Sequence, residues 1–135
     1  MAGYSKTPLA QKLGIKPNSR IALLNAPADY AHTLGHLPEG VTVLNTPESP
    51  LDLIQCFATT RSDLNARFGT LKAALRPDGA LWISWPKRSS GMPTDINENV
   101  VREIGLARGL VDVKVCAVDE IWSGLKFVYR VEDRH

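Results

Sequence analysis

Two apolar runs, Leu51-Asp-Leu-Ile-Gln-Cys-Phe-Ala58 and Ala80-Leu-Trp-Ile-Ser-Trp85, decide the fold of this chain. Each run is continuous rather than alternating, which is typical of a strand that is buried on both faces of a parallel sheet. Between them lies one apolar stripe at helical spacing, formed by Leu64, Phe68, Leu71 and Leu75. Pro77-Asp-Gly79 is expected to end this helix. The segment therefore predicts a strand, a crossover helix and a second strand parallel to the first.

Upstream of this unit the sequence predicts two further strands and two short helices. The expected elements are a helix capped by Thr7 and Pro8 and ended by Gly14, a strand over Arg20–Leu24, helical turns over Asp29–Leu34 closed by Gly35, and a strand over Val41–Leu44.

Downstream, a polar segment rich in turn-forming residues (86–93) precedes a helix and two strands. Asp95-Ile-Asn-Glu98 has the spacing of a capping box, and the helix is expected to reach Gly109. The strands are Val111–Val118 and Leu125–Val131, joined by a hairpin over Asp119–Gly124.

This order of elements predicts one α/β domain over residues 1–135. Right-handed crossovers favour a mostly parallel six-stranded sheet of order 2-1-3-4-6-5, with the last strand antiparallel. An open, flavodoxin-like sheet without the inserted last strand is the main alternative.

Composition agrees with a globular chain: 135 residues are 44% hydrophobic and 22% charged. Cys56 and Cys116 lie in apolar runs and form neither a CxxC motif nor a disulfide framework, so we expect packed, reduced thiols and a cytoplasmic location. No long apolar segment or leader sequence is found, so a membrane is not an expected partner. With 16 basic and 14 acidic residues the net charge is only +2, which disfavours nucleic acid.

The segment Leu75-Arg-Pro-Asp-Gly-Ala-Leu-Trp82 is similar to the helix, proline-glycine turn and strand in the second half of class I methyltransferases. The whole predicted sheet resembles a shortened, Rossmann-like class I methyltransferase sheet. Five further segments resemble a family of short bacterial proteins known only as a domain of unknown function: Tyr4–Gly14, Ile21–Pro27, Trp85–Lys87, Pro93–Asp95 and Val113–Lys126. This second resemblance implies no catalytic residues, because the family has no assigned reaction.

The turn that follows the first predicted strand argues against S-adenosylmethionine (SAM). A methyltransferase normally has a glycine-rich turn there, because the cofactor must approach backbone that no Cβ obstructs. Here the turn reads Asn25-Ala-Pro-Ala-Asp29, and Pro27 also lacks an N–H donor. After the second strand, Asn45-Thr-Pro47 replaces the expected acid, and Glu48 is the only nearby substitute. We therefore expect no SAM binding and no other cofactor.

Other catalytic and metal motifs are absent from the sequence. GxxxxGK[ST], GxGxxG and GxSxG do not occur. His32 and His36 have the spacing of a metal pair, yet no third ligand accompanies them, so we expect surface histidines and no metal. Ser89, Ser90 and Ser123 have no evident base, and no catalytic residue is predicted.

Two of the three tryptophans are expected in the core. Trp82 and Trp85 have opposite parity on one strand, so each can pack under helices on a different face. Trp122 is placed in the hairpin, where a packing lid and a ligand or partner contact both remain open.

Ligands of open α/β sheets bind beyond the carboxyl ends of the strands, so this edge is the predicted site. The residues expected there are Asn25, Tyr30, Thr59, Arg61, Lys87, Ser89, Ser90, Asp95, Asp119 and Trp122. A small anionic or planar ligand would suit them, with Lys87 and Arg61 supplying charge and Trp122 closing over the bound group. The alternative is structural. In that case Thr59 and Asp95 cap helices, Arg61 and Lys87 are solvated surface groups, and Asp119 and Ser123 form hydrogen bonds within the hairpin.

Three classes of function follow from these observations. The sequence favours a non-methylating module that binds a small ligand or regulates through one. A module for protein or RNA interaction and an enzyme without a recognisable motif remain the alternatives. The sequence indicates neither an oligomeric state nor a particular ligand.

Overall fold

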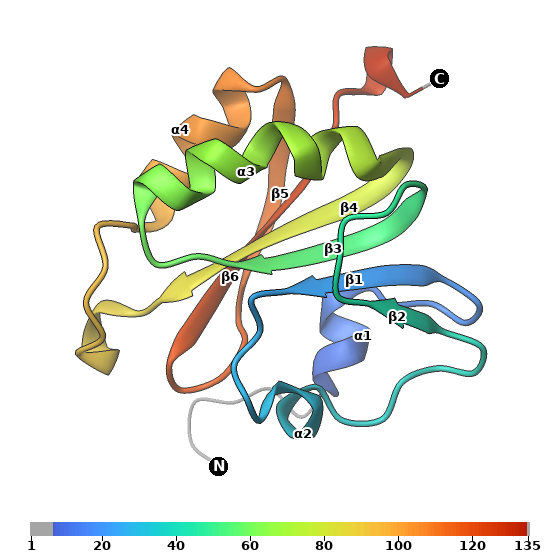
Figure 1. Cartoon of the computed structure of the whole chain (residues 1–135), viewed down its shortest axis with the longest axis horizontal. Helices are drawn as coiled ribbons and strands as arrows, with labels where there is room; N and C mark the ends of the chain where they lie inside the picture. The colour runs from blue at the N-terminus through green and yellow to red at the C-terminus, as the bar shows by residue number, and fades with distance from the viewer. Residues whose placement is uncertain (1–6, 135) are drawn as a thin grey trace.

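The computed structural model of the chain describes residues 7–134, which form one mixed sheet of six strands with helices on both faces (Figure 1). The strands are β1 (Arg20–Leu24), β2 (Thr42–Leu44), β3 (Leu51–Phe57), β4 (Leu75–Pro86), β5 (Leu110–Ala117) and β6 (Trp122–Tyr129). The helices are α1 (Leu9–Leu13), α2 (Tyr30–Leu34), α3 (Arg61–Ala74) and α4 (Glu98–Ala107), with 3₁₀ turns η1 (Arg88–Ser90) and η2 (Val131–Asp133).

The strand order is β2-β1-β3-β4-β6-β5, as predicted. The pairs β1–β2, β1–β3 and β3–β4 are parallel, whereas β6 is antiparallel to both of its neighbours. The last strand therefore inserts between β4 and β5, which rules out the open flavodoxin-like alternative. The carboxyl ends of β1, β3, β4 and β5 consequently meet at one edge of the sheet.

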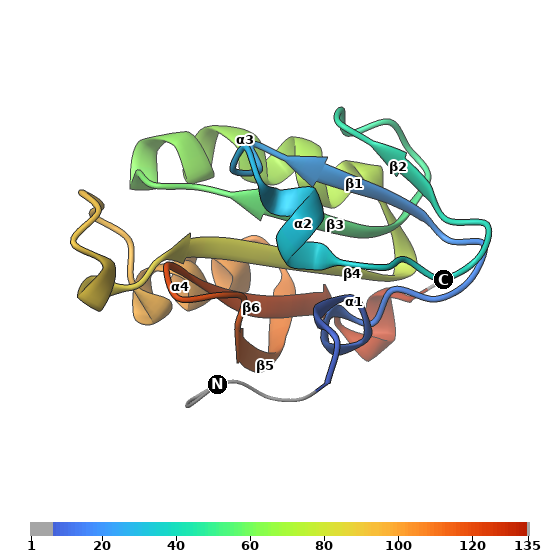
Figure 2. The same cartoon turned by 90° about the horizontal axis from the view of Figure 1, so that it is seen from below.

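Helices α3 and α4 cover one face of the sheet, and α1 and α2 cover the other (Figures 1 and 2). Two apolar clusters fill the layers between helices and sheet. Trp85 belongs to the cluster under α3 and α4, and Trp82 to the cluster under α1 and α2, which confirms that both are core residues. The indole Nε1 of Trp82 donates to the carbonyl oxygen of Leu13 at 2.8 Å and so fixes α1 on the sheet. Within residues 7–134, no helix has the length and apolar character needed to cross a membrane.

Helix α3 forms where its apolar stripe predicts, but it ends earlier. Leu64, Phe68 and Leu71 are all buried against the sheet. Leu75 already belongs to β4, where it pairs with Leu51, so the expected end at Pro77 is wrong. Proline disfavours helical backbone in the residue before it, and this limits how far the helix can extend.

Helix starts also differ from the predicted caps by one or two residues. Thr60, rather than Thr59, caps α3, and its hydroxyl oxygen accepts from the backbone N–H of Asp63 at 3.1 Å. Asn97, rather than Asp95, caps α4 through a 2.9 Å bond from the backbone N–H of Val100. Two candidate capping residues lie close together before α3 and again before α4, so sequence spacing alone does not identify the cap. At α1, Pro8 occupies the cap position that was predicted for Thr7.

The hairpin between β5 and β6 is shorter than predicted. Trp122 is the first residue of β6 rather than part of the loop, and its backbone oxygen accepts from the N–H of Val118 at 2.9 Å. The carboxylate of Asp119 accepts from the backbone N–H groups of Ile121 and Trp122, both at 2.8 Å. This side-chain turn lets the strand begin three residues before Leu125.

Candidate functional site

The ten predicted site residues follow strands whose carboxyl ends share one edge, and the structure divides them into three groups. Asn25, Tyr30 and Trp122 surround Phe57. Thr59, Arg61 and Asp95 lie where the start of α3 meets the segment before α4. Lys87, Ser90 and Asp119 are joined through the loop after β4, and Ser89 lies in η1 of that loop.

Phe57, the last residue of β3, is the centre of the first group. The ring of Tyr30 packs edge-on against it with centroids 4.8 Å apart, and Trp122 does so at 5.0 Å. Tyr30 is 2% exposed and Trp122 is 7% exposed, so both aromatic side chains belong to the core. The amide Nδ2 of Asn25 donates to the carbonyl oxygen of Phe57 at 3.5 Å. These three side chains therefore pack around Phe57 at the carboxyl edge of the sheet.

A buried polar chain begins at Tyr30. Its hydroxyl donates to Oε1 of Gln55, and Nε2 of Gln55 donates to Oγ of Ser84 at 3.1 Å. Gln55 and Ser84 are fully buried. Burial raises the pKa of Tyr30 far above its ordinary value, so the phenol stays protonated and remains a donor. Sequence reasoning missed this chain, although a glutamine inside a continuous apolar strand was a visible signal.

The loop after β4 is tied to the β5–β6 hairpin by Lys87. Its ammonium Nζ donates to the carbonyl oxygen of Asp119 at 2.6 Å, and its backbone N–H donates to that of Ile121 at 2.7 Å. The structure therefore joins Lys87 to Asp119 and Ile121 of the hairpin. Their bonds hold the loop and the hairpin in place.

The start of α3 is joined to the segment before α4 by two short hydrogen bonds. Oδ1 of Asp95 accepts from the backbone N–H of Arg61 at 2.7 Å, and Oγ1 of Thr94 donates to the carbonyl oxygen of Thr59 at 2.6 Å. The exposed guanidinium of Arg61 has no acceptor among residues 7–134. Asp95 thus caps α3, a helix other than the one predicted for it.

The loop between β4 and α4 encloses a cavity of about 570 Å³, lined by residues of the segment 85–97. Trp85 and Met92 contribute apolar surface, and Arg88 and Asp95 contribute charge. The guanidinium of Arg88 is exposed and makes no hydrogen bond or ion pair within the described part of the chain. Arg88 and Met92 belong to no sequence motif, and only the folded loop shows that they line a cavity.

A smaller cavity of about 220 Å³ lies between the ends of β1 and β2 and the surface of α3. Asn25, Asn45 and Arg67 line it. Arg67 is already paired with Asp63 at 2.8 Å, so its charge is largely compensated. The larger cavity, by contrast, contains a guanidinium without a partner among the described residues, that of Arg88.

The described residues contain no cluster of three potential metal ligands among His, Cys, Asp and Glu. His32 and His36 are both exposed. Cys56 is fully buried, which confirms its packing role, and burial raises the pKa of its thiol to about 11. Cys116 is half-buried, and burial raises its pKa as well. Neither thiol is activated as a nucleophile at neutral pH.

No sequence model of a protein family matches the chain, and no curated protein matches it in sequence. Its fold nevertheless resembles those of solved methyltransferases. A SAM-dependent methyltransferase from Aquifex aeolicus is 17% identical, with a TM-score of 0.65 over 88% of this chain and 86% of its own. The precorrin-6y C5,15-methyltransferase of Geobacter metallireducens GS-15 is 8% identical, with a TM-score of 0.60 over 90% and 86%.

The magnesium protoporphyrin IX methyltransferase of Synechocystis PCC 6803, solved with bound SAH, is 10% identical, with a TM-score of 0.60 over 90% of this chain and 78% of its own. At such identities the similarity establishes the fold alone. The chain has a Rossmann-like class I methyltransferase fold with a mixed six-stranded sheet. The resemblance to a short bacterial family stays a prediction.

The turn after β1 has no glycine at the position where a methyltransferase is expected to have one. Asn25 adopts the left-handed backbone region, with φ of 57°, and thus takes a conformation that glycine usually supplies. Its side-chain amide donates to the carbonyl oxygen of Phe57 at 3.5 Å and so links the ends of β1 and β3. The carboxylate of Glu48 lies 3.5 Å from the guanidinium of Arg20, so this acid already has a charged partner.

Proposed function

We propose that this protein is a non-methylating module that binds a small anionic or planar ligand at the carboxyl edge of its sheet. The observation that carries the proposal is the cavity of about 570 Å³ beside the unpaired guanidinium of Arg88. Its volume lies within the range of about 300–1,000 Å³ that small-molecule sites occupy. The aromatic rings of Tyr30 and Trp122 pack against Phe57 at the same edge of the sheet.

The chemistry of the lining indicates the ligand class. A free guanidinium presents parallel N–H donors that match a carboxylate or phosphate. Asp95 uses Oδ1 on the backbone of Arg61 and retains a second oxygen that can accept from a ligand N–H or hydroxyl. The rings and thioether of Trp85 and Met92 give apolar contact for a flat group. A planar carboxylate that also carries a donor fits this set.

The same loop suggests how binding could regulate. Lys87 anchors one end of the loop to the hairpin, and Asp95 anchors the other end to α3. A ligand between these anchors would contact the intervening loop, which includes Ser89 and Ser90 of η1. The ligand would thereby change the surface that this edge presents to other molecules.

A thermal-shift screen with nucleotides, SAM and planar carboxylates tests the proposal. A ligand at 100 times its dissociation constant stabilises the folded state by about 2.7 kcal/mol. We expect a planar carboxylate to give such a shift and Arg88→Met to abolish it. Arg130→Met is the matched control, because it removes an exposed guanidinium that follows β6 at the opposite edge. An unchanged shift in Arg88→Met would contradict the proposal, as would a screen without any stabilising ligand.

A further inference from the structure

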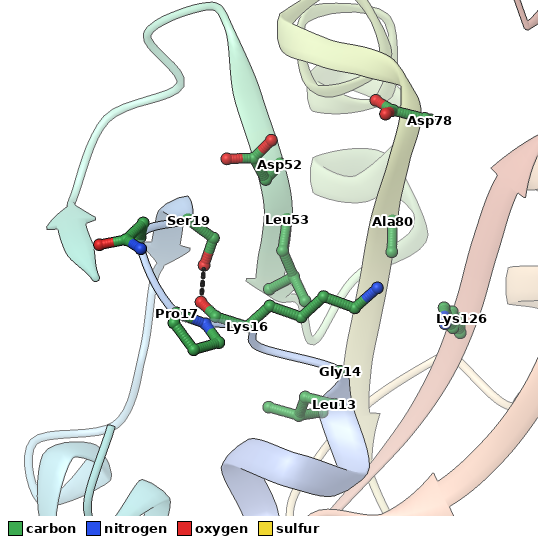
Figure 3. A pocket seen from close by; sticks show the side chains of 11 residues that line it. Leu13, Gly14, Lys16, Pro17, Ser19, Asp52, Leu53, Asp78, Ala80 and Lys126 are labelled. Atoms are coloured by element: carbon green, nitrogen blue, oxygen red, sulfur yellow. Dashed lines mark hydrogen bonds between the residues drawn. The ribbon is translucent and has the colours of Figure 1, made fainter. Parts of the chain in front are cut away.

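A third cavity, of about 390 Å³, lies at the opposite edge of the sheet (Figure 3). The connection between α1 and β1 forms one wall, and the first residues of β3 and of the regular part of β4 form another. Leu53 and Ala80 provide an apolar floor, while Lys16, Lys126 and two aspartates provide charge. No residue of the carboxyl-edge site lines this cavity.

Lysine side chains gather on one side of the cavity. In Figure 3 the side chain of Lys16 extends across the hollow, with its ammonium on the side of Lys126. Lys114 is the direct cross-strand neighbour of Lys126, so it adds a third positive charge. None of these three ammonium groups forms an ion pair or hydrogen bond within residues 7–134.

Lys126 is half-buried, whereas Lys16 and Lys114 are exposed. Burial lowers the pKa of its ammonium, and the neighbouring charges of Lys114 and Lys16 lower it further. No described acid compensates this repulsion. A bound anion would relieve it, because attraction between opposite charges strengthens as water is excluded.

The carboxylates of the two aspartates already have partners that do not line the cavity. Oδ2 of Asp52 accepts from the backbone N–H of Arg20 at 2.8 Å. The Nε atom of Arg76 lies 3.4 Å from Asp52 and 3.5 Å from Asp78, so one guanidinium serves both carboxylates. Figure 3 shows these aspartates on a different part of the rim from Lys126. The cavity is therefore positive on one side and has oxygen acceptors on the other.

We propose that this cavity binds a phosphate monoester of a small hydroxylated compound, with its phosphate between Lys16 and Lys126. The hydroxyl groups of the ligand would donate to the carboxylates of Asp52 and Asp78. The volume exceeds that of a phosphate group alone, so it leaves room for the remainder of such a molecule. This site is separate from the carboxyl-edge cavity, and the two proposals stand or fall independently.

Phosphate groups of a nucleic acid share the same chemistry, but the geometry favours a small molecule. A polyanion leaving the lysine side would meet the carboxylates of Asp52 and Asp78 on the rim. Like charges there oppose a continuous backbone, whereas the hydroxyls of a small ester would be accepted.

Calorimetric titration with inorganic phosphate, ribose 5-phosphate and a short single-stranded oligonucleotide tests the assignment. We expect ribose 5-phosphate to bind, inorganic phosphate to bind more weakly, and the oligonucleotide to be bound no better than inorganic phosphate. Lys126→Met and Lys16→Met should each weaken ribose 5-phosphate binding by about ten-fold or more. Arg130→Met is the control of equal charge change, because Arg130 is exposed and does not line the cavity, and it should leave this binding unaltered.

Three results would overturn the proposal. The first is no binding of either small phosphate at millimolar concentration, and the second is binding that survives both lysine substitutions. The third is binding of the oligonucleotide alone, which would assign the lysines to a nucleic-acid surface. Lys16 lies on an exposed connection, so its substitution provides a test even if Lys126→Met perturbs the sheet.

Discussion

Replacing Trp122 by alanine tests whether this residue is part of the core or a lid over a ligand. The indole is 7% exposed and packs edge-on against Phe57 at 5.0 Å. Removing a buried tryptophan costs about 3–5 kcal/mol in unfolding free energy, including the cavity it leaves. With an unfolding entropy of about 2.1 cal/mol/K per residue over 135 residues, the midpoint temperature should fall by about 10–18 °C.

Urea unfolding of the wild type, Trp122→Ala and Trp122→Phe measures this loss directly. We expect Trp122→Phe to retain part of the contact with Phe57 and to lose less than the alanine variant. If Trp122→Ala costs less than about 1 kcal/mol, the side chain behaves as a surface group and its assignment to the core is wrong.

Two further predictions concern packing and pH. Gly105→Ala should destabilise the protein by about 1–3 kcal/mol in urea unfolding, because its new methyl group would overlap the ring of Phe127. Gly69→Ala, also in a helix but with room for a methyl group, should be neutral or stabilising, and equal losses would contradict the packing. Arg102 donates to Asp112 at 2.9 Å and lowers the pKa of that carboxyl, so the pair contributes stability above pH about 4 that is lost as pH falls through the lowered value. Asp112→Asn should therefore cost about 0.5–1 kcal/mol at pH 7 and much less near pH 2, whereas an equal loss at both pH values would exclude the pairing as its cause.

The sheet could be predicted because the apolar pattern of its strands differs from that of its helices. The runs at Leu51–Ala58 and Ala80–Trp85 are continuously apolar, and only a strand covered on both faces needs that pattern. With every crossover right-handed, few strand orders remain. Burial of Trp82 and Trp85 on opposite faces then follows from their parity on one strand.

The partners of the site residues could not be predicted, because they lie far away in the sequence. Asp95 caps α3 across 34 residues, and spacing suggested instead that it caps the helix that follows it. Trp122 belongs to β6 because the carboxylate of Asp119 builds a tight turn before it. Three segments that are distant in sequence contribute the lysine cluster, namely Lys16, Lys114 and Lys126. No local sequence motif predicts it.

Calorimetric titration with SAM is the most direct test of the central claim, which separates the methyltransferase fold of this chain from methyltransferase chemistry. We predict no binding at micromolar concentration, because the turn after β1 has no glycine, Asn25 links it to β3, and Glu48 already pairs with Arg20. A dissociation constant below about 10 μM, equivalent to about −7 kcal/mol, would contradict it.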